Sequence, residues 1–225
     1  MIALAASHLL ILITFALIAW ATPARGWRLF LALLALGAGV GSFNLLIEAI
    51  AFGVIGWAQA ANAFAMQLGV FALLAALVTL ASPKRPATNA PTLRLGPLRI
   101  AGVVLGYEAL YVTAGMLVFP YVAAFYADHH IPAIGEVLAL QAVRALVFVA
   151  SSVLVLRGGL RFAPLVLGVA FSVIGGLSPL LPDNPLMPPE VRVPHAVEVG
   201  ISNFLFGALT GWLLTRGNQR RTAAA

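Results

Sequence analysis

The sequence contains no cysteine and few charged residues. Of its 225 residues, 9% are Asp, Glu, Lys or Arg, whereas 62% are hydrophobic. The absence of cysteine excludes disulfide bonds, thiolate metal sites and cysteine nucleophiles. Soluble domains carry roughly 25% charged residues, so this chain has too little polar surface to stay in solution as a folded domain. The composition therefore predicts an integral membrane protein whose main partner is the lipid bilayer.

The sequence lacks the motifs that characterise several classes of enzyme and receptor. The chain has no G-x-S-x-G nucleophile elbow, no H-E-x-x-H zinc motif and no phosphate-binding loop. Its single lysine, Lys84, lies in a polar connection, so no lysine is available within the membrane to hold retinal as a Schiff base. No cofactor and no catalytic residue are expected. The net charge of +6 comes from basic residues in the connections on one side of the membrane, as described below. No nucleic-acid partner is therefore expected.

Long hydrophobic runs dominate what the chain does contain. A membrane-spanning helix needs about 20 mostly apolar residues. The segments that meet this requirement are 3–22, 29–56, 61–82, 98–126, 134–156, 160–181 and 195–215. All are expected to be helices, because an open strand edge would leave backbone hydrogen bonds unsatisfied in hydrocarbon. The predicted fold is an all-α integral membrane protein, a single domain built as a bundle of seven transmembrane helices.

The basic residues predict how this bundle is oriented. Eleven of the thirteen fall in connections on one side, including the basic loop 83–97 and the C-terminal tail, and no acidic residue lies in those connections. The positive-inside rule places this side in the cytoplasm. We therefore expect the N-terminus outside and the C-terminus in the cytoplasm. The excess of arginine over lysine suggests a bacterial genome rich in GC, and hence the bacterial inner (plasma) membrane as the location.

Two oppositely charged residues are predicted near the membrane midplane. Glu108 lies about ten residues into the fourth span and Arg144 about ten residues into the fifth, which places each roughly 15 Å deep. Because consecutive spans are antiparallel neighbours, we expect a buried Glu108–Arg144 ion pair, with Gln141 one helical turn away on the face of Arg144. Such a pair either locks two helices together or serves gating or proton transfer.

A second group of polar residues is expected nearer the outside. His195, Glu198 and Ser202 lie on one stripe of the seventh span, and Asn44 and Glu48 lie four residues apart on the second. The predicted outer polar cluster consists of Asn44, Glu48, Glu136, His195, Glu198, Ser202 and Asn203.

The connection 182–194 is rich in proline, which fixes φ and blocks helix continuation. It is predicted to form either a rigid connector or a lid over the outer polar cluster. Arg192 is the basic residue of this connection, and we expect it to pair with Glu190, Glu198 or Glu48.

Histidines and carboxylates also raise the question of a metal site. The low-ranking candidate ligands are Asp128, His129, His130, His195 and Glu198. A His and a Glu three residues apart on a helix can share one metal, but no spacing in the sequence requires the other ligands to converge. The simpler interpretation is that these histidines are solvated at the membrane interface, and no metal is predicted.

Three functions fit these observations. The first is a small transporter or ion-coupled permease with a polar outer cavity, since carboxylates at two depths and a midplane arginine are typical of such proteins. The second is an intramembrane hydrolase or metal-dependent enzyme acting on a lipid-soluble substrate, with His195 as acid and Glu48 or Glu198 as base. The third is a structural or assembly subunit of a membrane complex. We expect a protein that is not an enzyme; no motif names a substrate or an oligomeric state.

Overall fold

The structure is a computed structural model that describes residues 1–83, 91–126, 132–183 and 187–217. Its elements are helical, and two of them are π-helices, labelled η. In chain order they are α1 (Ile2–Ala21), α2 (Trp27–Ala38), η1 (Gly39–Phe43), α3 (Asn44–Ala51), α4 (Trp57–Ala81), α5 (Pro97–Tyr126), α6 (Ile134–Arg157), α7 (Ala163–Ser172), η2 (Val173–Leu177), α8 (Ser178–Leu180) and α9 (Pro189–Thr215).

The prediction of seven membrane-spanning helices is confirmed for the described residues. Seven helical segments are long and apolar enough to cross a bilayer. Two of them are composite: Trp27–Ala51 joins α2, η1 and α3, and Ala163–Leu180 joins α7, η2 and α8. Each π-helix thus continues a span without ending it.

Two predicted boundaries differ from the structure by at least five residues. The second span ends at Ala51 rather than at 56, because the chain turns at Gly53, whose φ is 68°. The last span begins at Pro189 rather than at 195. Proline is compatible with the first helical turn, where its missing N–H has no intrahelical partner to lose. Part of the proline-rich connection is therefore helix.

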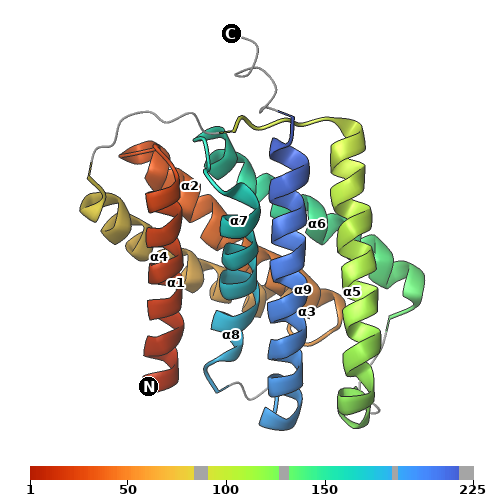
Figure 1. The fold of residues 1–225 in the computed structure, drawn as a ribbon. Helices are drawn as coiled ribbons and strands as arrows, with labels where there is room; N and C mark the ends of the chain where they lie inside the picture. The colour runs from red at the N-terminus through yellow and green to blue at the C-terminus, as the bar shows by residue number, and fades with distance from the viewer. Residues whose placement is uncertain (84–90, 127–131, 184–186, 218–225) are drawn as a thin grey trace.

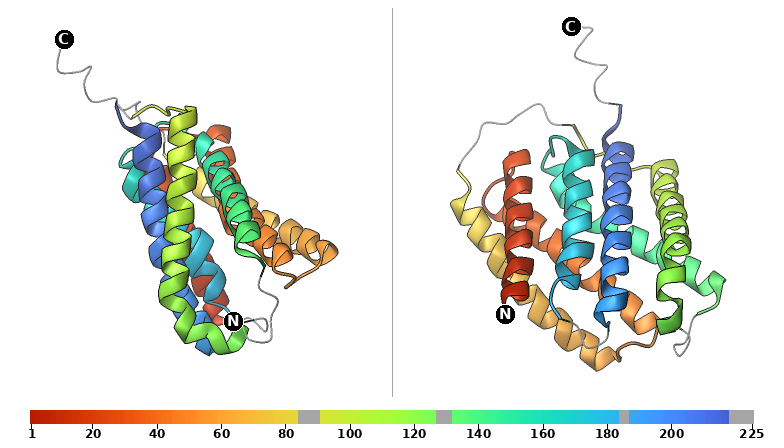
Figure 2. Two further views of the ribbon diagram at one scale, coloured as in Figure 1. Left: turned by 90° about the vertical axis from the view of Figure 1, so that its right-hand side faces the viewer. Right: turned by 60° about the horizontal axis from the view of Figure 1, so that its bottom comes forward.

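The helices form two layers (Figures 1 and 2). One layer is a row in the order α1, α7, α9, α5, with α9 packed between α7 and α5. The second layer contains α4, α2 and α6, with α2 packed between the other two. Its helices are inclined to those of the first layer, as the side view in Figure 2 shows. This inclination brings residues of α3 and α6 to one level inside the bundle.

Helices α7 and α9 approach each other at two glycines. A Cβ atom on Gly207 would lie 2.3 Å from the Leu167 carbonyl oxygen, and one on Gly211 would lie 2.6 Å from the Ala163 carbonyl carbon. Both contacts are with backbone atoms, so no side chain can move aside. The spacing Gly207–x₃–Gly211 therefore serves the close helix packing expected of small residues in membranes.

The arginine-containing connections gather at one end of the bundle. The Arg161 amide donates to the Ala21 carbonyl at 2.9 Å, and the Arg94 amide donates to the Leu214 carbonyl at 2.8 Å. These bonds join the end of α1, the connection before α5, the start of α7 and the end of α9. We call this the basic end, and the opposite end, where α1 and α9 begin, the His195 end (Figure 1).

Candidate functional site

Arg144 of α6 is the centre of a buried polar network. Its side chain is 7% exposed. The Nε atom donates to Oδ1 of Asn44 at 3.3 Å, and Nη1 donates to Oε1 of Gln141 at 2.9 Å and to Oε1 of Glu48, with which Arg144 forms an ion pair. We call these four residues the Arg144 network. One permanent cation is thus held by one carboxylate and two amide oxygens.

The π-helix η1 sets the direction of Asn44 and Glu48. Both residues lie on α3, which begins where η1 ends. A π-turn inserts one extra residue, which rotates every following residue by about 100° around the helix axis. Close packing fixes the turn, because a Cβ atom on Gly41 would lie 2.7 Å from Cγ2 of Ile174 in η2. The rotation sends Asn44 and Glu48 toward α6.

The expected Glu108–Arg144 ion pair does not form between the described residues. Helix α5 instead presents the neighbouring Tyr107, which is 4% exposed and whose ring centroid lies 5.8 Å from Cζ of Arg144. Adjacent residues point about 100° apart on a helix, so Glu108 faces another direction and is only half-buried. Among the described residues, Glu108 has no salt-bridge partner, and Glu48 takes its place.

A second polar contact joins two residues of α9. Nδ1 of His195 lies 2.9 Å from Oε2 of Glu198, one helical turn away, and their side chains are 30% and 14% exposed. Tyr111 of α5 interacts electrostatically with Glu198 and also with Glu48 and Arg144. Glu198 faces α5, because a Cβ atom on Gly115 would lie 3.8 Å from its Oε1. Among the described residues, no hydrogen bond joins the His195–Glu198 pair to the Arg144 network. The outer polar cluster predicted from the sequence is brought together to this extent.

Asn203 belongs to a different contact from the one predicted. Its Nδ2 donates to the Gly175 carbonyl at 3.2 Å. Gly175 lies in η2, where a π-turn disturbs the regular hydrogen bonds of the helix. Asn203 thus stabilises η2. The adjacent Ser202 is half-buried and makes no hydrogen bond with another described residue.

Glu136 stands apart from the network as well. It is exposed, and its Oε2 accepts a hydrogen bond at 3.1 Å from the amide of Ala133, which precedes α6. A carboxylate in the first turn of a helix satisfies a free N–H and interacts favourably with the helix dipole. Glu136 therefore helps to begin α6.

Arg192 does not pair with Glu190. Its Nη1 donates to the Pro182 carbonyl at 2.9 Å, and its Nη2 donates to Oδ1 of Asp183 at 3.0 Å. Glu190 is exposed and forms no ion pair with another described residue. Arg192 thus joins the residues that follow α8 to the first turns of α9. The predicted contact with a carboxylate of α9 or α3 does not form between the described residues.

A metal site of three or more His, Asp or Glu ligands is absent from the described part of the chain. Of the candidate ligands, the structure brings together His195 and Glu198. The other three candidates, Asp128, His129 and His130, lie outside the described residues.

Four aromatic residues close the bundle on the basic-end side of Arg144. We call them the aromatic plug: Tyr107, Phe148, Phe171 and Phe206. Their ring centroids lie 4.5 Å apart for Tyr107–Phe206, 4.6 Å for Phe148–Phe171 and 5.1 Å for Phe148–Phe206. Phe148 is one helical turn beyond Arg144 along α6, toward the basic end. The three phenylalanines are 0% exposed, so the plug is tightly packed.

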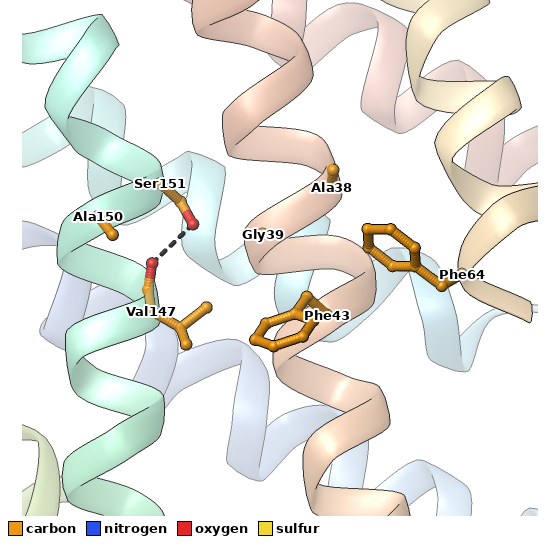
Figure 3. Close-up of a pocket in the computed structure, with 7 residues that line it drawn as sticks. All are labelled: Ala38, Gly39, Phe43, Phe64, Val147, Ala150 and Ser151. Carbon is orange, nitrogen blue, oxygen red and sulfur yellow. Dashed lines mark hydrogen bonds between the residues drawn. The ribbon is translucent and has the colours of Figure 1, made fainter. Parts of the chain in front are cut away.

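An apolar groove lies between η1, α4 and α6 on the outside of the bundle (Figure 3). Its volume is ≈ 310 Å³, and Phe43, Phe64 and Val147 line it. Its polar lining group, the Ser151 hydroxyl, donates to the Val147 carbonyl at 2.6 Å. Such a groove fits lipid chains and is separate from the Arg144 network.

No known protein family, characterised protein or solved structure matches the chain. The chemistry of the site therefore rests on its own groups. These are a guanidinium, two carboxylates, a histidine, two tyrosines and two amides, which suit ion binding and proton transfer. The charged, histidine and amide residues of this set were all candidates from the sequence.

Proposed function

We propose that this chain is a small ion-coupled membrane transporter, whose solute enters from the His195 end and whose movement is coupled to protonation of Glu48. The observation that carries the proposal is a polar series that consists of the His195–Glu198 pair near one end of the bundle and the Glu48–Arg144 pair in its interior, with Tyr111 in electrostatic range of both. A polar series of this kind in a membrane protein usually marks a substrate or ion pathway.

The series ends at a buried residue. The side chains are 30% exposed for His195, 14% for Glu198, 26% for Glu48 and 7% for Arg144. Beyond Arg144, the aromatic plug offers no charged group and no open space to an ion. A polar entry closed by an apolar constriction is the arrangement that alternating access requires of a state open to one side.

The composition of the Arg144 network also favours a functional role. Transferring an arginine and a carboxylate out of water costs more free energy than their mutual attraction recovers. Well-packed apolar residues in their place often stabilise a protein core at least equally. In lipid this cost makes intramembrane charges candidates for function. A transporter explains why the chain retains a cation, an anion and two amides at one depth.

We place the His195 end outside the cell and the basic end in the cytoplasm, in the inner membrane of a bacterium. The support is the gathering of Arg94, Arg99, Arg157 and Arg161 at the basic end, which the positive-inside rule assigns to the cytoplasm. In this orientation the N-terminus is outside and the C-terminus is inside.

Uptake into vesicles tests the proposal. The purified protein is reconstituted into liposomes and offered a panel of small polar solutes with an acidic exterior. We expect accumulation of at least one solute, dependence of its uptake on the pH gradient, and loss of that dependence in Glu48→Gln and Glu198→Gln. The control is Glu190→Gln, which changes an exposed carboxylate at the same end and should leave uptake intact.

A protein that moves no solute of the panel above the rate of empty liposomes contradicts the proposal. Uptake whose pH dependence survives both substitutions contradicts the role given to the carboxylates.

A further inference from the structure

The hydrogen bonds of the Arg144 network leave several donors unused. Nε and Nη1 of Arg144 make all three of its hydrogen bonds, and Nη2 makes none with another described residue. A guanidinium presents five N–H donors in a planar fork, so the two donors of Nη2 remain. They lie beside Nη1, which donates to Glu48 and to Gln141.

Both amides of the network have an unused NH₂ group. Asn44 and Gln141 are each 0% exposed, and neither Nδ2 of Asn44 nor Nε2 of Gln141 makes a hydrogen bond of regular geometry, although the Asn44 amide interacts with the Tyr107 hydroxyl. Their orientation is determined by Arg144, which donates hydrogen bonds but cannot accept them. The amide oxygens must therefore face the guanidinium, and the NH₂ groups face away from it.

Unused donors of this kind are costly, and a native structure usually satisfies them. A buried polar group without a partner costs about 1–3 kcal/mol, and such groups often mark a place for water, an ion or a ligand. In this network the buried groups without a regular hydrogen bond, the NH₂ groups of Asn44 and Gln141, are donors. They match a ligand that offers only acceptors, which is an anion.

We propose that the Arg144 network is a binding site for a small carboxylate, which replaces the Glu48 carboxylate on the guanidinium. Glu48 shows that a carboxylate fits between Arg144 and its neighbours, because it already occupies that position. A free carboxylate with two oxygens would meet the fork of Arg144 side-on, and the NH₂ groups of Asn44 and Gln141 are the further donors of the site.

The exchange also explains the coupling to protons. Protonated Glu48 is neutral and releases Arg144. The incoming anion then neutralises the guanidinium, so that one proton and one anion enter together without net charge. The charged and titratable groups around Glu48 are Arg144 of α6 and Tyr107 and Tyr111 of α5. This inference gives the substrate class of the proposed transporter and rests on that function for its physiological meaning.

Binding of acetate to the purified full-length protein in detergent tests the site without any transport step. The affinity is measured by calorimetry at constant ionic strength, with chloride and phosphate as comparison anions. Glu48→Gln removes the competing carboxylate and keeps its shape, so acetate should bind about 10-fold more tightly. Gln141→Met removes a donor at nearly constant volume, and acetate should bind about 10-fold more weakly. The control Glu190→Gln should bind acetate as the unaltered protein does.

The outcomes separate the anion site from the transporter. A tighter complex in Glu48→Gln supports the site and cannot arise from misfolding, which only weakens binding. Acetate affinity that is the same in Glu48→Gln, Gln141→Met and the unaltered protein overturns the site, even if vesicles accumulate another solute. Chloride or phosphate binding as tightly as acetate, with the same response to the substitutions, overturns the assignment to carboxylates. Acetate binding without transport of any carboxylate leaves the site in place and refutes the transporter.

Discussion

Arg144 and Glu48 are 96 positions apart in the chain and form an ion pair inside the bundle. The contact joins α6 to α3. Helix α6 is a regular helix, whereas α3 belongs to a composite span whose direction is set by the π-helix η1. The guanidinium would otherwise face hydrocarbon, where insertion of an arginine costs roughly 2.5–3.5 kcal/mol. The stability of the bundle and its proposed function therefore depend on the same pair.

Removing one partner of this pair should destabilise the protein strongly. Arg144→Leu leaves Glu48 without its partner, and Glu48→Leu leaves Arg144 without its own. We expect a loss of about 3–5 kcal/mol for each single variant, because an uncompensated buried charge remains. The double variant should recover most of this loss. Unfolding in detergent, followed for the four proteins of the cycle, measures the coupling.

Glu108→Leu is the matched control for this cycle. It changes a carboxylate that lies next to Tyr107 in α5 but has no salt-bridge partner among the described residues. We expect a change of less than about 0.5 kcal/mol. If Glu108→Leu were as destabilising as Glu48→Leu and coupled to Arg144→Leu, the pairing expected from the sequence would hold instead.

The sequence was sufficient to predict the seven spans but placed Glu48 at the wrong depth. Apolar length alone determines whether a segment can cross a bilayer, and charge density in the connections shows which loops gather together. Depth was counted along upright helices, which put Arg144 near the midplane and Glu48 nearer the outside, although the two residues pair. The helices of the second layer are inclined (Figure 2), and tilt depends on packing, which a single sequence does not encode locally.

The π-helices explain why the partner of Arg144 was missed. The segment Gly39–Phe43 contains glycines that also suit ordinary close packing. Nothing in its composition distinguishes an α-turn from a π-turn, yet the extra residue rotates Asn44 and Glu48 around the axis. The polar residues of the site could thus be named from the sequence, whereas their pairing required the packing of Gly41 against Ile174.

Enlarging Gly207 should separate α7 from α9. In Gly207→Val, the Cβ atom would lie 2.3 Å from the Leu167 carbonyl oxygen, so one helix must move. We expect a loss of about 3 kcal/mol, the upper part of the range for overpacking, measured by thermal unfolding in detergent. The control is Gly69→Val in α4, where an added Cβ meets nothing within 4 Å. Equal stabilities of the two variants would show that the α7–α9 contact is looser than described.

Tyr111 should act in proton transfer but not in anion binding. Its hydroxyl lies within electrostatic range of both Glu198 and Glu48. Tyr111→Phe keeps the ring and removes the hydroxyl, and we expect proton-coupled uptake of a small carboxylate such as lactate into vesicles to fall on the order of 10-fold while acetate affinity in detergent stays the same. Tyr121→Phe, at a position of α5 that is 77% exposed, is the control and should leave both unchanged.

The pH dependence of this uptake has a defined sign. Because the proposed transporter moves one proton inward with each anion, uptake should rise as the exterior is made more acidic and should vanish when the exterior is the more alkaline side. Because one proton and one anion move together, no current should accompany uptake. A current that reverses with the membrane potential would instead mean that the anion moves alone.

The orientation can be tested directly because the chain contains no cysteine. A single introduced cysteine is then the only thiol that a maleimide can modify. Glu190→Cys lies at the His195 end and Leu95→Cys at the basic end, and both positions are exposed. With intact cells and a maleimide that does not cross membranes, we expect Glu190→Cys to be labelled at once and Leu95→Cys to be labelled after permeabilisation. The reverse pattern would place the basic end outside, against the positive-inside rule, and the polar series would then begin in the cytoplasm and serve export.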